Sequence, residues 1–123
     1  MAFQVTLRFI VVICFTFLVQ VSLAEHNIRQ CADPTQAAHI LCQKDIKDGA
    51  KFLQIIKEVV DCPESGINTY PITCILVTNQ LGDDGGDAEI VSGGIGYTSV
   101  EISMTSKLSK GLDYHMEIYT AQE

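Results

Sequence analysis

A histidine between two carboxylates is the most chemically suggestive spacing in this sequence. His115 stands two residues after Asp113 and two residues before Glu117, in a stretch where the intervening residues are apolar. Side chains two residues apart on a strand point to the same face, so all three would project together. Imidazole and carboxylate groups bind metals, but a site needs ligands from a second element, and none is evident. We therefore interpret these residues as the solvent-facing side of a strand and expect no metal site.

Two loops invite other ligand-binding interpretations. Asp83, Asp84 and Asp87 form an acidic run, but it lacks the alternating ligands and the distal glutamate of a calcium-binding EF-hand loop. The run 93–96 (Gly-Gly-Ile-Gly) fits neither common phosphate-loop pattern, and a predicted strand rather than a helix follows it. We expect a flexible acidic turn at the first site. At the second we expect a bulge or a tight crossing where a Cβ would clash, and no cofactor at either.

Nucleophilic catalysis has little support in the sequence. No G-x-S-x-G motif is present, and the three histidines, His26, His39 and His115, lie in unrelated sequence contexts. A cysteine nucleophile would need an unpaired thiol, whereas the cysteines that follow the leader described below are even in number. We therefore expect a protein that is not an enzyme and has no catalytic residues.

The first 24 residues have the pattern of a secretory signal peptide. Arg8 precedes an apolar run over 9–18, and the segment closes on small residues at Ser22 and Ala24. The strongly apolar stretch is little more than half of the roughly 20 residues that a membrane span needs. We expect cleavage after Ala24, which makes 1–24 a signal peptide and 25–123 a single small secreted domain without a membrane anchor.

Removal of this leader sharpens the charge balance. The 123-residue chain has 15 acidic and 8 basic residues and a formal charge of −7. All the acidic residues follow the leader and Arg8 lies within it, so 15 acidic residues oppose seven basic ones and the charge becomes −8. An acidic chain without basic patches argues against direct binding of nucleic acid. It could bind a basic protein partner, whose identity and whose stoichiometry the sequence does not reveal.

Four cysteines remain after the leader, and they are predicted to form two disulfides. An even count in a small secreted chain is typical of disulfide staples, and spacings of 11, 20 and 12 residues contain no C-x-x-C pair for zinc or redox chemistry. Three connectivities are possible. The disulfide candidates are Cys31, Cys42, Cys62 and Cys74.

The elements that must carry these residues are predicted to be mainly strands. The stretches 97–106 and 112–119 alternate apolar and polar residues, and 107–111 between them ends in glycine, so we predict an antiparallel hairpin. The stretch 70–79 is apolar on both faces, as in a strand central to a sheet or covered on both sides. A short strand is expected over 88–91.

The segment 52–60 is ambiguous between helix and strand. Its apolar positions fit an amphipathic helix, but half of them are β-branched and an Asp-Gly turn signal precedes them at 48–49. As a strand, it could pair across that turn with 39–45. The predicted fold is mainly β, a small antiparallel sheet or sandwich with disulfides, and the alternative is an α+β fold with a helix at about 50–60.

The sequence from Cys74 onward resembles the insect multiprotein bridging factor two family, also described as transcription activators or probable salivary secreted peptides. The resemblance depends on an I-x-V-T strand ending, a Gly-Gly pair before a short strand, a G-G-x-G-Y run and G-L-D-Y opening the last strand. These motifs occupy 75–78, 85–90, 93–97 and 111–114 in this sequence. The chain departs from the family at Asn79, where Asp is usual, and in its Lys-Leu-Ser turn at 107–109. The resemblance implies a β-rich fold, which favours a strand over 52–60, and brings no catalytic residues.

Two functions follow as expectations. The leader favours a secreted, non-enzymatic protein of insect saliva, venom or haemolymph that acts by binding a protein. The family resemblance supplies the alternative, a transcription coactivator that bridges protein partners.

Overall fold

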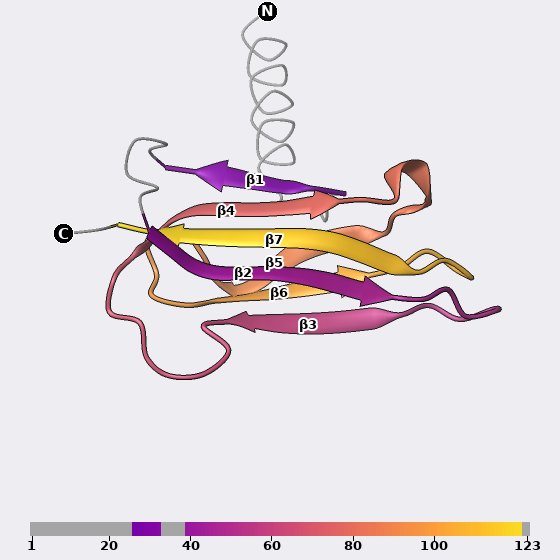
Figure 1. Cartoon of the computed structure of the whole chain (residues 1–123), viewed down its shortest axis with the longest axis horizontal. Helices are drawn as coiled ribbons and strands as arrows, with labels where there is room; N and C mark the ends of the chain where they lie inside the picture. Colours follow the sequence, from indigo (N-terminus) through magenta and orange to yellow (C-terminus); the bar gives the residue numbers. More distant parts are fainter. Residues whose placement is uncertain (1–25, 33–38, 122–123) are drawn as a thin grey trace, which may run out of the picture.

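The computed structural model describes residues 26–32 and 39–121, and within these residues it contains seven strands in two antiparallel sheets (Figure 1). The leader predicted at 1–24 lies outside the described residues. One sheet has four strands in the order β1-β4-β7-β2, and the other has three in the order β3-β6-β5. The strands are β1 (Ile28–Cys31), β2 (His39–Asp48), β3 (Lys57–Cys62), β4 (Ile72–Asn79), β5 (Asp87–Gly93), β6 (Val100–Thr105) and β7 (Leu112–Thr120).

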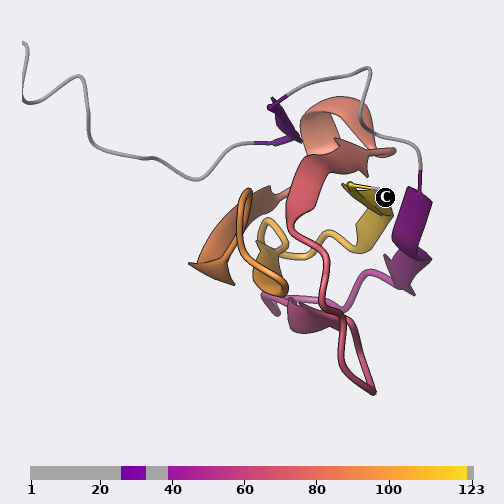
Figure 2. The ribbon, with the colours of Figure 1, turned by 90° about the vertical axis from the view of Figure 1, so that its left-hand side faces the viewer.

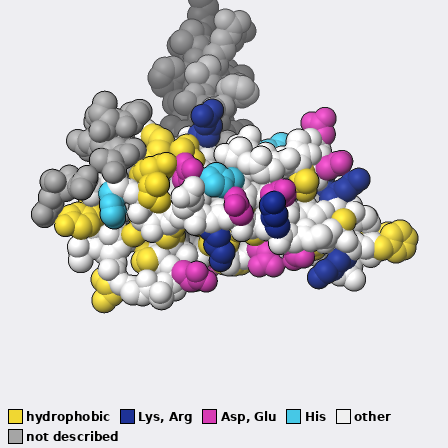
Figure 3. Space-filling view, in the orientation of Figure 1, with side chains coloured by type: hydrophobic (Ala, Val, Ile, Leu, Met, Phe, Trp, Pro, Cys, Tyr) yellow, Lys and Arg dark blue, Asp and Glu magenta, His cyan; other side chains and the backbone are white. Residues whose placement is uncertain are grey.

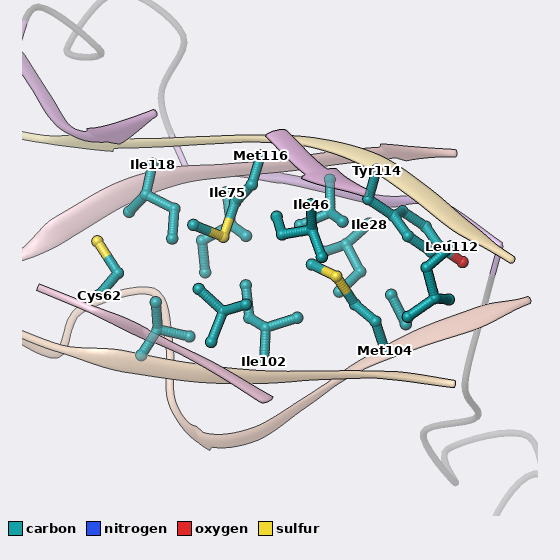
Figure 4. Close-up of a cluster of buried hydrophobic side chains, with 14 of the residues drawn as sticks. Ile28, Ile46, Cys62, Ile75, Ile102, Met104, Leu112, Tyr114, Met116 and Ile118 are labelled. Carbon is teal, nitrogen blue, oxygen red and sulfur yellow. The ribbon is translucent and has the colours of Figure 1, made fainter. Parts of the chain in front are cut away.

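The two sheets pack face to face as a β-sandwich, which confirms the mainly β prediction. Figure 2 looks along the strands and shows the sheets as separate layers. Inward-facing side chains from both sheets meet between them, with Ile75, Met116 and Ile118 from one sheet facing Ile102 and Met104 from the other (Figure 4). All five are at most 1% exposed. Along β7, buried and half-buried residues alternate strictly, which separates this shared core from the outer side of the four-stranded sheet.

The predicted hairpin between 97–106 and 112–119 is wrong. Both segments contain a strand, but β6 pairs with β3 and β5, whereas β7 pairs with β2 and β4 in the opposite sheet. The alternating pattern shows which face of a strand is apolar and does not show which strand pairs with it. β6 and β7 have the alternation expected of a hairpin, but their apolar faces meet across the core and the two strands do not lie side by side.

The segment 52–60 is neither a helix nor a full strand. Its first half, up to Ile56, is a connection, and β3 begins only at Lys57. Among the described residues no α-helix is present, so the α+β alternative is not supported. The suggested pairing of 39–45 with this segment is also wrong, because β2 and β3 belong to different sheets. The β-branched residues therefore indicated a strand correctly only in the second half of the segment 52–60.

The four cysteines form two disulfides, as predicted, and the structure settles the connectivity. Cys31 bonds to Cys74 between the paired strands β1 and β4 of one sheet. Cys42 bonds to Cys62 and joins β2 of one sheet to β3 of the other, with 6.2 Å between their Cα atoms. Because β2 and β3 are edge strands of different sheets, this second bond closes one open side of the sandwich covalently.

The connection between β5 and β6 fulfils the expectation of a tight crossing. Gly93 has a φ of 72°, and a Cβ placed there would lie 2.1 Å from the carbonyl oxygen of Ser99. The pairing register of β5 also shifts between Ile90 and Ser92, which leaves Val91 as an extra residue in an edge strand. Glycine is thus required at Gly93 both by the backbone conformation and by the space available.

Candidate functional site

The centre of the exposed face of the four-stranded sheet carries a hydrogen-bonded group that we call the histidine cluster, namely Asp45, His115, Glu117 and Tyr119. The His115 Nδ1 lies 2.6 Å from Asp45 Oδ1, and its Nε2 lies 2.9 Å from Glu117 Oε1. The Tyr119 hydroxyl donates to Glu117 Oε2 at 2.8 Å. Figure 3 shows a histidine and neighbouring acidic side chains on this face. The cluster is thus a continuous network on an exposed sheet surface.

The paired strands explain why these four residues meet. Along β7, residues of one parity are buried in the core, and residues of the other parity, including His115, Glu117 and Tyr119, face outward. The antiparallel pairing of β2 with β7 places Asp45 directly opposite His115. On the other side β4 places the uncharged Thr78 opposite His115. Two carboxylates therefore flank the imidazole, and no other charged residue stands opposite it.

The cluster favours the charged forms of His115 and Glu117 and the neutral form of Tyr119. Hydrogen bonds to Asp45 and then to Glu117 raise the pKa of His115, against a smaller effect of desolvation. Hydrogen bonds from His115 and then from Tyr119 lower the pKa of Glu117. The bond to Glu117 raises the pKa of Tyr119. Only a protonated ring can donate from both nitrogens, so the two carboxylate partners favour the imidazolium form of His115.

The cluster is therefore expected to make stability depend on pH. Because the folded pKa of His115 lies above its unfolded value, its contribution is complete below the unfolded value and is lost as pH rises through the folded one. A His115→Gln variant should lose more unfolding free energy relative to wild type at about pH 5.5 than at about pH 9. Urea unfolding at both pH values measures this difference.

A His39→Gln variant provides the control for that measurement. His39 is exposed at the start of β2, and within the described residues its ring takes part in no side-chain hydrogen bond. This substitution leaves the cluster intact, so the free-energy difference between this variant and wild type should depend on pH less than that of His115→Gln. An equal pH dependence in the two histidine variants would contradict the assigned role of the cluster.

The predicted trio of Asp113, His115 and Glu117 does share one face of β7, as the alternation indicated. However, Asp113 is not part of the cluster, because it stands opposite Lys47. The second carboxylate comes from Asp45, which sequence reasoning missed. The stretch 43–48 is polar except for Ile46 and shows no clear alternation, so only the strand pairing shows which residue Asp45 faces.

The other candidate ligands do not converge on one point. Asp83 and Asp84 lie in a short 3-10 helix (Gly82–Asp84), where Lys107 donates to the Asp83 carbonyl and Lys110 lies 3.7 Å from the Asp84 carboxylate. Asp87 begins β5 and lies 3.7 Å from His26. Within the described residues, no group of three or more His, Cys, Asp or Glu side chains is arranged to hold a metal ion.

The glycine run 93–96 uses its own amides within the fold. The amide of Gly94 donates to Ser99, that of Gly96 to Ile72, and that of Tyr97 back to Gly94. A phosphate loop must aim several free amides at one anion. These donors are already committed to carbonyls in different directions, so the run serves as a backbone crossing.

One buried polar group lies apart from these candidates. The Tyr114 side chain is fully buried, and its hydroxyl is without a hydrogen-bond partner in the described structure. Burial, with a smaller contribution from Asp87, raises the pKa of Tyr114 to about 12. A hydroxyl that stays neutral and sealed in the core cannot exchange protons with a substrate near neutral pH.

Comparison with known proteins gives one match. A sequence-family model described as "Transcription activator MBF2" matches residues 33–120, which is most of the chain. No curated protein and no solved structure matches this chain. Over the described residues, no helix combines the length and the hydrophobicity needed to cross a membrane.

Proposed function

The chain belongs to the MBF2 transcription activator family, and from this membership we propose that it acts by binding another protein and not by catalysis. The observation that carries the proposal is the histidine cluster on the exposed face of the four-stranded sheet. Both ring nitrogens of His115 are occupied by carboxylates, so the ring is not free to act as a general base. Its hydrogen bonds instead hold charges in fixed positions, which is what a recognition surface requires.

The charge of the cluster indicates the kind of partner. One imidazolium between Asp45 and Glu117 leaves the cluster with one net negative charge, in a chain whose formal charge with neutral histidines is −7. A basic protein surface would complement it, and long-range attraction would speed the encounter. Tyr119 adds an aromatic side chain of a type enriched in protein interfaces.

We propose further that binding takes place outside the cell. The pattern of residues 1–24 supports export, and the two disulfides support an oxidising compartment, because disulfides are rare in cytosolic and nuclear proteins. Insect saliva, venom or haemolymph is the expected setting, following the resemblance to salivary secreted peptides.

A second candidate function comes from the family description. A transcription activator acts in the nucleus, where this chain would bridge protein partners without binding nucleic acid directly. The two candidates agree on protein binding and differ in compartment and redox state, so one measurement on the expressed protein can separate them.

Intact mass spectrometry after expression of the full chain in insect cells makes that separation. The secreted function predicts a species in the medium that begins at Glu25 and lacks four hydrogens, one pair for each disulfide. An uncleaved, fully reduced species confined to the nucleus would overturn it and support the coactivator function.

Protein binding itself is tested with immobilised oxidised protein. Partners captured from haemolymph or from nuclear extract should be lost when the cluster is reversed in charge by Asp45→Lys and Glu117→Lys. An Asp61→Lys variant, with its exposed substitution on the other sheet, is the matched control and should retain them. Equal capture by all three proteins, or specific capture by none, would contradict the proposal.

A further inference from the structure

One end of the sandwich exposes a concentration of apolar side chains. It consists of the segments 49–57, which join β2 to β3, and 106–111, which join β6 to β7, and we call it the lysine–apolar end. Phe52 is 83% exposed and Leu53 is 64% exposed, and more than half of the surface of Ile55 and of Leu108 is also exposed. In Figure 1 these connections lie together at the right-hand end of the molecule. The apolar side chains thus project from the end of the fold, beyond the sheets.

Hydrogen bonds hold the two segments in this form. The Leu53 amide donates to Ser109 Oγ at 2.7 Å, and the Ser109 amide donates to the Gln54 carbonyl at 2.9 Å. Closer to the core, the Ile56 amide donates to Ser106 Oγ at 2.7 Å, and the Ser106 amide returns a bond to the Ile56 carbonyl. The exposed side chains are therefore displayed by a clamped pair of loops.

The same hydrogen-bonded pair includes strained backbone. Leu53 and Ser109 have φ values of 55° and 61°, and within the described residues no other non-glycine residue has a positive φ. A branched aliphatic residue such as leucine pays a steric penalty in this region. Strain of this kind persists where contacts from the surrounding structure hold the backbone in place, and it concentrates at functional sites.

Lysines surround the exposed apolar residues. Lys51, Lys57, Lys107 and Lys110 all belong to the lysine–apolar end, and its two segments contain no Asp or Glu, although the chain as a whole is acidic. Figure 3 shows basic side chains next to the hydrophobic tip at the right-hand end. The fold thereby brings four lysines together around the exposed apolar side chains, with Asp48 and Glu58 directly flanking the first segment.

Two of these lysines have partners on a neighbouring connection. Lys107 and Lys110 reach the carbonyl of Asp83 and the carboxylate of Asp84. Among the described residues, neither Lys51 nor Lys57 forms an ion pair. The positive charge available to an external ligand therefore lies mainly on the segment that also carries Phe52, Leu53 and Ile55.

From this juxtaposition we propose that the lysine–apolar end docks on an anionic phospholipid bilayer, with Phe52, Leu53 and Leu108 entering the headgroup region and the lysines contacting phosphate. The composition favours lipid over protein. Lysine is depleted in protein interfaces, whose energetic centres are rich in Trp, Tyr and Arg. Lysine and aliphatic residues side by side suit a membrane interface, because a lysine stem covers apolar surface while its ammonium reaches the headgroups.

The shape of this end supports the same conclusion. Its apolar side chains sit on two loops, and the hollow next to this end, lined by 47–50, Leu81 and 111–113, does not include them. A projecting apolar tip can insert shallowly into a bilayer. This docking is independent of the protein binding proposed for the exposed face of the four-stranded sheet.

Vesicle co-sedimentation of oxidised residues 25–123, which contain every described strand, tests the proposal. Wild type should bind vesicles of phosphatidylcholine with about 30% phosphatidylserine and bind pure phosphatidylcholine much less. Phe52→Ser with Leu53→Asn should lower the partition coefficient at least about tenfold, because two exposed side chains no longer enter the membrane. Lys51→Gln with Lys57→Gln should also lower it about tenfold or more on the anionic vesicles.

Each pair has a matched control. Ile67→Ser removes an apolar side chain that is 93% exposed on the connection between β3 and β4, and Lys44→Gln removes a lysine of the β2 edge. Both controls should bind like wild type, and circular dichroism should show all variants folded. Asparagine tolerates the positive φ at position 53, so the first variant is not expected to unfold.

Three outcomes would overturn membrane docking. The first is no binding of wild type to either vesicle, and the second is equal binding to both. The third is an equal loss in the control variants. One pattern of results would identify this end as a protein-docking site instead. Wild type would bind neither vesicle, and the Phe52→Ser, Leu53→Asn variant would lose a captured protein that the Asp45→Lys, Glu117→Lys variant retains. That result would reject the lipid proposal and leave the function proposed for the histidine cluster standing.

Discussion

Replacing Cys42 and Cys62 together by alanine is expected to lower the free energy of unfolding by about 3 kcal/mol. The two cysteines are 20 residues apart, and releasing a loop of that length returns this much chain entropy to the unfolded state. Cys62 is also 1% exposed within the core, so the missing sulfur adds a small cavity. Urea unfolding of the oxidised wild type and of the variant measures the difference.

The second disulfide provides the comparison. Cys31 and Cys74 are 43 residues apart, so on loop length alone their removal costs about 4 kcal/mol. These cysteines link strands that are already hydrogen-bonded, whereas β2 and β3 belong to different sheets. Hydrogen exchange should therefore rise mainly in β1 when Cys31 and Cys74 are replaced, and in both β2 and β3 when Cys42 and Cys62 are replaced. Unchanged denaturant midpoints in both variants would contradict a stabilising role.

A Gly86→Ala substitution is expected to cost about 3 kcal/mol or more. A Cβ on Gly86 would lie 1.7 Å from the backbone oxygen of Thr105 and 2.7 Å from the Cα of Ser106. Both obstacles are backbone atoms at the end of β6, where Ser106 is also bonded to Ile56. Relief would require β5 and β6 to separate, and thermal unfolding followed by circular dichroism would record the loss.

Gly49→Ala is the matched control for this substitution. Nothing lies within 4 Å of a Cβ built on Gly49, and its φ is not positive. The alanine variant should be as stable as wild type or slightly more stable, because it reduces the entropy of the unfolded chain. Equal destabilisation at Gly86 and Gly49 would show that close packing of β5 against β6 is not the cause.

The sequence was sufficient to predict the class of fold but not its connectivity. Alternation in β6 and β7 correctly identified two strands and their apolar faces, and four cysteines correctly indicated two disulfides. The placement of β6 and β7 in one sheet was predicted wrongly. A strand has the same apolar face whether the next strand in the sequence joins its own sheet or the opposite one. Pairing depends on long-range contacts that a local pattern does not encode.

The same limit applies to the sites. That His115 and Glu117 share a face followed from their spacing on one strand. The contribution of Asp45 depended on the register between β2 and β7, which is fixed across 70 residues of chain. The lysine–apolar end was hidden for a related reason. The apolar and β-branched residues of 52–60 indicated a helix or a strand, whereas 52–56 form a connection.

The extra residue in β5 also governs how this edge of the sandwich meets a second molecule. An edge strand presents unpaired amides and carbonyls, and a regular one can add a strand from another copy and so begin a fibre. The register shift at Val91 interrupts that template, and an antiparallel pair of copies in which Asp87 faces Glu89 would bring like charges together. The β5 edge thus resists self-association, and an open-sided, acidic sandwich can remain dispersed at high concentration.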